Sequence, residues 1–87
     1  MNVVVISGVV TKITKIGEGC VIDLCDNINA KEICCIAKGK TADEIHGRVK
    51  DNDKVVIVGT LKHGMYFNTD AFPDDDWYIA ICTVSII

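Results

Sequence analysis

Apolar runs rich in valine and isoleucine, separated by turn residues, dominate the N-terminal half of the chain and predict β-strands. Residues 2–16 are rich in valine, isoleucine and threonine and predict a first strand, in which Gly8 marks a bulge or a tight bend at a barrel corner. The segment 17–19, Gly-Glu-Gly, predicts a hairpin turn. A second strand is predicted over residues 20–25 and a third over residues 31–38.

The period changes to that of a helix after Gly39. Residues 41–50 predict one short helix, because its apolar residues fall at i, i+3 and i+7: Ala42, Ile45 and Val49. Thr41 is the predicted N-cap, and Glu44 three residues later would complete a capping box. Asn52 is a candidate for the left-handed residue that ends the helix.

Two further strands complete the predicted order. Residues 54–63 predict a fourth strand and residues 76–87 a fifth, separated by a loop over 64–75 that holds the only proline. Five strands with a helix between the third and fourth are typical of the OB fold, a partly open barrel. We therefore expect residues 1–87 to form a single all-β OB-fold domain, whose binding face lies on strands two and three.

One segment carries a more specific signal than the strand pattern. Residues 38–61, KGKTADEIHGRVKDNDKVVIVGTL, resemble the centre of bacterial single-stranded DNA-binding proteins. The matching positions are Gly39, Lys40, Ala42, Asp43, Lys50, Val55, Ile57, Gly59 and Leu61. Residues 1–12, MNVVVISGVVTK, are similar to the start of the same family. Other OB-fold proteins of replication, such as the primosomal replication protein, share much of this pattern.

The resemblance implies a non-catalytic protein that binds single-stranded DNA in replication, repair or recombination, as a homodimer or homotetramer. The sequence also departs from the family. Where the third strand of the family carries aromatic side chains that stack on bases, this chain has Glu32 and Lys38. The acidic C-terminal tail of the family, which recruits partner proteins, has no counterpart before Ile87, so we expect a short form.

The net charge of −3 does not favour a polyanionic ligand, but the acidic residues are unevenly distributed along the chain. Four of the twelve acidic residues lie within residues 70–76, and the other eight nearly balance the nine basic residues. Four lysines are candidates for phosphate contacts along one groove: Lys12, Lys38, Lys40 and Lys62. The alternative is that they are scattered, solvated surface residues.

All five aromatic residues follow residue 65: Tyr66, Phe67, Phe72, Trp77 and Tyr78. Tyr66, Phe67 and Trp77 are the candidates for stacking on bases. The same cluster suits a loop folded into the barrel mouth, or a subunit contact. Trp77 and Tyr78 are adjacent in a strand and point to opposite faces, so we expect one of them in the core.

The cysteines predict neither a disulfide framework nor a metal site. Their number, five, is odd, and the N-terminus shows no secretory signal, so we expect reduced thiols in the cytoplasm: Cys20, Cys25, Cys34, Cys35 and Cys82. Cys20 and Cys25 should face opposite sides of a strand, as should Cys34 and Cys35, and there is no Cys-x-x-Cys pair. Buried or half-buried strand residues are therefore the favoured interpretation of the cysteines.

No motif indicates catalysis or a cofactor. The acids Asp74–Asp76 favour a solvated turn over a cation site, because three consecutive carboxylates rarely converge on one ion. His46 and His63 have no nucleophile or acid at the spacing of a triad, and no glycine-rich phosphate loop is present.

A second hypothesis remains open beside DNA binding. The chain could be an OB module that has lost nucleic-acid binding and serves protein interaction or assembly. The acidic balance and the missing stacking aromatics favour this alternative. Under the DNA-binding hypothesis, strand one and the Ile/Val-rich end of the sequence are the expected interfaces of the oligomer.

Overall fold

A computed structural model of the chain describes residues 3–26, 28, 31–63 and 77–87. Its elements follow the predicted order of three strands, one helix and two strands: β1 (Val3–Ile16), β2 (Gly19–Asp26), β3 (Glu32–Lys38), α1 (Lys40–Arg48), β4 (Lys54–His63) and β5 (Trp77–Ile86). The predicted strand bounds agree to within one residue. In the described part of the chain, no helix is long and apolar enough to cross a membrane.

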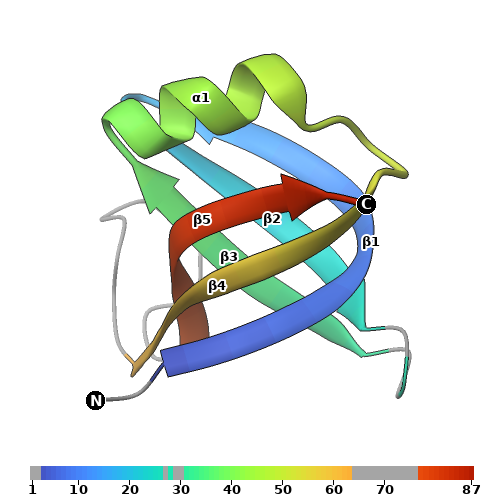
Figure 1. Cartoon of the computed structure of the whole chain (residues 1–87). Helices are drawn as coiled ribbons and strands as arrows, with labels where there is room; N and C mark the ends of the chain where they lie inside the picture. Colours follow the sequence, from blue (N-terminus) through green and yellow to red (C-terminus); the bar gives the residue numbers. More distant parts are fainter. Residues whose placement is uncertain (1–2, 27, 29–30, 64–76) are drawn as a thin grey trace.

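The five strands form a barrel in the order β1-β2-β3-β5-β4 (Figure 1). The barrel is closed rather than partly open, because β1 is long enough to pair with β4 along its first half and with β2 along its second. All the pairings are antiparallel except the one between β3 and β5. That parallel pairing covers only two residues of each strand, Cys35 with Ile79 and Ile36 with Ala80.

Gly8 lies where β1 passes from one partner strand to the other. It is aligned with Asp26 of β2 and with Val55 of β4. A Cβ atom at this position would overlap the carbonyl oxygen of Cys25, so the close approach of β2 requires glycine. The predicted bulge does not lie at Gly8: the register of β1 on β2 shifts further along, between Val10 and Lys12.

The helix begins one residue earlier than predicted, and Thr41 is not its N-cap. The N-cap residue is Gly39, whose φ of 62° turns the chain directly from β3 into α1 without a side-chain cap. The Gly39 N–H donates to the carbonyl oxygen of Glu18 at 3.0 Å, which ties this turn to the β1–β2 hairpin. Asn52 has the predicted left-handed φ, 74°, although the helix itself ends at Arg48.

One end of the barrel is closed by α1, as Figure 1 shows. The predicted stripe of Ala42, Ile45 and Val49 is buried there, at most 3% exposed. It packs in one cluster with the inward side chains of the strands, Cys20, Ile22 and Leu24 of β2 among them. The inward residues near the start of β1, Val4 and Ile6, are only partly buried, so the described part of the chain leaves the barrel open at the opposite end.

Candidate functional site

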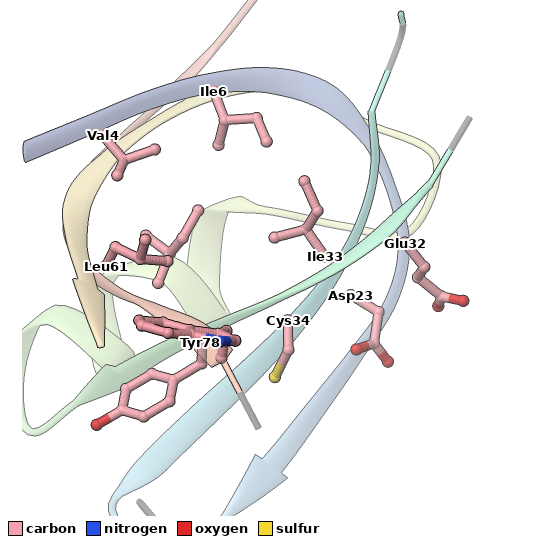
Figure 2. A pocket seen from close by; sticks show the side chains of 10 residues that line it. Val4, Ile6, Asp23, Glu32, Ile33, Cys34, Leu61 and Tyr78 are labelled. Carbon is pink, nitrogen blue, oxygen red and sulfur yellow. The ribbon is translucent and has the colours of Figure 1, made fainter. Parts of the chain in front are cut away.

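A pocket of about 510 Å³ occupies the open end of the barrel (Figure 2). A volume of this size lies in the range of pockets that hold small molecules or side chains of a partner. Its described lining comes from all five strands: Val4, Ile6, Asp23, Glu32, Ile33, Cys34, Leu61, Trp77, Tyr78 and Ile79.

The pocket connects the interior of the barrel with its outer surface. Strands β3 and β5 pair only at their middle and start, so the first residues of β3 have no ladder partner on β5. The lining includes both faces of β3 there, with Ile33 inward and Cys34 outward. Figure 2 shows Ile33 on the same side of β3 as Val4 and Ile6, and Cys34 on the other side. The pocket therefore passes through the seam between β3 and β5.

The inner wall of the pocket is aliphatic. Val4, Ile6 and Ile33 pack against the core cluster but are only partly buried, and Leu61 is 37% exposed. Ile79, at 3% exposed, forms the floor. This wall is core surface that no described element covers, and burying it against an apolar group would be favourable.

The outer mouth of the pocket carries two carboxylates, Asp23 on β2 and Glu32 on β3. Burial raises the pKa of Asp23; the Glu32 charge adds to the increase, and Lys12 opposes it. The Thr11 hydroxyl lies within hydrogen-bonding distance of the Asp23 carbonyl oxygen, at 3.0 Å, and of the Glu32 carboxylate, at 3.2 Å. This part of the site is suited to a hydrogen-bond donor or a cation.

The two aromatic residues of β5 both line the pocket, and neither is a core residue. Trp77 is 57% exposed, and its ring lies 4.6 Å from the His63 ring, at an angle of 46°. Tyr78 is partly buried. The prediction that one of the two would be in the core is wrong, because β5 begins at the open end of the barrel, where α1 does not reach.

The predicted lysines divide into two pairs. Lys12 is the cross-strand partner of Asp23 and Lys62 that of Tyr78, so these two exposed lysines border the pocket residues on either side. Lys38 is exposed at the far end of β3, opposite Gly19 of the hairpin. It lies four positions along the strand from Cys34, a distance of about 13 Å.

The other predicted site residues lie away from the pocket or outside the described part of the chain. Lys40 is the exposed first residue of α1, close in sequence to Lys38 and at the capped end of the barrel. Tyr66 and Phe67, like the acids Asp74–Asp76, lie outside the described residues. The pocket thus brings Lys12, Lys62 and Trp77 into one neighbourhood and leaves Lys38 and Lys40 in another.

Asp23, Glu32 and the aliphatic wall were not among the predicted site residues. A weak signal for Asp23 is present, since it is the one charged residue within the segment 20–25, CVIDLC. Its partners across the sheet, Lys12 and Cys34, depend on strand register, which the spacing within one strand does not reveal.

The cysteines face the directions that were predicted. Cys20 and Cys35 are buried in the core, while Cys25, Cys34 and Cys82 are partly buried or exposed, and all five are free thiols. Burial raises the pKa of Cys35 to about 12, with smaller contributions from Cys34 and Asp23. Within the described residues, no group of three or more His, Cys, Asp or Glu side chains could hold a metal ion.

Comparison with known proteins identifies the fold. No protein-family model matches the sequence, and no curated protein matches it significantly. The second single-stranded DNA-binding protein, SSBb, of Mycobacterium smegmatis matches with a TM-score of 0.70 and 14% identity, over 100% of this chain and 87% of that chain. The SSB domain of a Synechococcus protein matches with a TM-score of 0.73 and 15% identity, over 97% and 93%.

A different kind of OB-fold protein matches equally well. OBody NL8 bound to hen egg-white lysozyme has a TM-score of 0.73 and 20% identity, over 100% of this chain and 94% of that chain. At such identities a likeness shows the fold alone. The chain is therefore an OB-fold barrel of five strands with one short helix between β3 and β4.

Proposed function

We propose that the chain binds single-stranded DNA without catalysing a reaction, and that it acts in replication, repair or recombination. The observation that carries the proposal is the strand register, which places Lys12 opposite Asp23 and Lys62 opposite Tyr78. Two cations therefore border a surface that also presents the Trp77 ring. Single-strand binding requires this combination of phosphate-binding charges and flat side chains for the bases.

In this proposal the phosphates contact Lys12 and Lys62, and a base stacks on Trp77. Lys38 and Lys40 would extend the path toward the capped end, and Tyr66 and Phe67 would supply further stacking. One stacked base contributes about 1–3 kcal/mol, so binding by one chain would be weak.

Assembly into a homodimer or homotetramer would compensate by linking several weak grooves. An uncharged stretch on the outer face of β1, β4 and β5 supports this part of the proposal. It contains Val3 and Val5, which are 58% and 66% exposed, beside Val58 and Thr60 of β4 and Thr83 of β5. An exposed apolar surface of this kind marks a protein–protein contact.

Fluorescence anisotropy with a labelled oligo-dT of about 30 nucleotides tests the proposal. We expect binding that weakens steeply between low and moderate salt, because counterions are released from the phosphates. The double variant Lys12→Glu, Lys62→Glu should lose binding, and Lys38→Glu with Lys40→Glu should weaken it as well, with the oligomer size unchanged in both. Trp77→Ala should weaken binding about tenfold.

The outcome that would end the DNA proposal is an absence of binding at low salt by protein that is folded and assembled. Unchanged affinity in both lysine variants would instead remove the proposed interface. Size-exclusion chromatography with light scattering, run on the same samples, supplies the oligomer size that the comparison needs.

Protein interaction is the second candidate function. The net charge of −3 and the two carboxylates at the pocket mouth favour it, since both oppose a polyanion. In either case we expect a reducing compartment, the cytoplasm, because all five cysteines are free thiols.

A further inference from the structure

We propose that the pocket at the open end of the barrel is a docking site for a protein segment that carries a large apolar side chain beside an arginine or lysine. The proposal deepens the second candidate function by naming the site and the chemistry of the partner. It does not depend on DNA binding.

The aliphatic wall of the pocket favours an apolar side chain of the partner. At the capped end of the barrel, Ile45 of α1 fills the space between the inward-facing strand residues and is 2% exposed. At the open end the corresponding residues, Val4, Ile6 and Ile33, remain partly exposed, and no described helix covers them. An apolar side chain of a partner would complete the core there as Ile45 does at the other end.

The carboxylates at the mouth favour a basic residue of the partner beside its apolar side chain. Asp23 and Glu32 both line the pocket, and no lysine or arginine does so among the residues that the structure describes. A guanidinium group binds carboxylates through paired hydrogen bonds, and it would relieve the repulsion between these two acids. Burial and the Glu32 charge raise the pKa of Asp23, and Lys12 only partly opposes this increase, so a further cation at the mouth would be favourable.

The arrangement of the two parts favours a peptide over a nucleotide. The aliphatic wall lies inward of β3 and the carboxylates lie outward, at the mouth (Figure 2). A nucleotide inserting its base into the wall would bring its phosphate toward Asp23 and Glu32, where like charges repel. A peptide that inserts an apolar side chain would place a neighbouring basic residue at the same carboxylates, where the charges are complementary.

Trp77 makes the site directly observable, because it is the only tryptophan of the chain and lines the pocket. The probe is a peptide of about eight residues with one phenylalanine between two arginines, and otherwise glycine and serine. Titration of the whole chain should give a saturable change in Trp77 emission. A peptide with glutamate in place of both arginines should bind at least about tenfold more weakly.

Matched variants separate the site from a general charge effect. Asp23→Asn with Glu32→Gln should weaken peptide binding at least about tenfold. Asp43→Asn with Glu44→Gln removes the same two charges from the exposed surface of α1 and should leave the affinity unchanged. Leu61→Ser should weaken binding through the apolar wall, and its 37% exposure makes it tolerable for folding.

Three results would overturn the proposal. The first is the absence of a saturable change in Trp77 emission when the peptide is added to the wild-type chain. The second is equal affinity for the arginine and glutamate peptides. The third is an equal loss of peptide affinity in the pocket variant and the helix variant. Oligo-dT binding, measured on the same samples, keeps the two proposals apart. The Asp23→Asn, Glu32→Gln variant should retain DNA binding, so DNA binding without peptide binding contradicts this inference alone.

Discussion

Aliphatic side chains face inward at both ends of this barrel, but they are fully buried at only one of them. At the capped end, α1 lies over the strands and buries Ile45 to 2% exposure. At the open end, Ile6 and Ile33 face inward in the same way but stay partly exposed above a pocket. Within the described residues, the strands alone leave these inward side chains partly exposed, whereas α1 completes the core at the other end.

The same truncation made at each end tests this difference in packing. We expect Ile45→Ala to lower the free energy of unfolding by about 2–5 kcal/mol, since it opens a cavity under the helix. Ile6→Ala should cost about half as much, because that side chain is already partly exposed. Urea denaturation of both variants provides the measurement. Equal losses would show that the open end is as well packed as the capped end.

Glycine substitutions test where the backbone itself is tightly packed. Gly8→Ala should destabilise the chain by about 1–3 kcal/mol, because the new methyl group overlaps the carbonyl oxygen of Cys25. Gly47→Ala is the control, since a Cβ atom on this helical residue meets nothing within 4 Å. It should stabilise the chain by about 0.5–1 kcal/mol. Thermal or urea unfolding should therefore shift in opposite directions, and a stabilising Gly8→Ala would contradict the observed close approach.

The smallest expected effect concerns the charge at the pocket mouth. The folded-state pKa of Asp23 is raised above the ordinary value of 3.8, so the folded state binds more protons than the unfolded state just above that value. Stability should then fall as pH rises from 3.8 through the folded-state pKa. Above that pKa, Asp23→Asn should stabilise the chain by less than about 1 kcal/mol, because the group is only partly buried.

Urea midpoints measured at several pH values compare this variant with wild type. Asp43→Asn, on the exposed surface of α1, is the control. A constant difference between Asp23→Asn and wild type across the acid range would contradict the raised pKa. A difference that changes with pH over this range would assign the raised pKa to Asp23.

Much of the fold could be read from local patterns. The strand period over 20–25 places Cys20, Ile22 and Leu24 on one face, and the structure has this face in the core. The spacing of Ala42, Ile45 and Val49 correctly predicts the buried helix face. Where the prediction of Thr41 as N-cap failed, a tertiary contact decided the outcome. Gly39 turns the chain early and donates to Glu18 of the hairpin, so the helix begins without a side-chain cap.

The order of the strands and helix, the hairpin and the two faces of β2 were predictable from the sequence, because periods and turn residues act between near neighbours. Only the tertiary structure decided the site. The short parallel contact of β3 with β5 leaves the seam open, and the register of β1 on β2 brings Lys12 beside Asp23. The contact of β3 with β5 depends on residues far apart in the chain, and the register of β1 on β2 depends on which residues form the hairpin turn. One residue of slip would turn each strand's side chains to the other face.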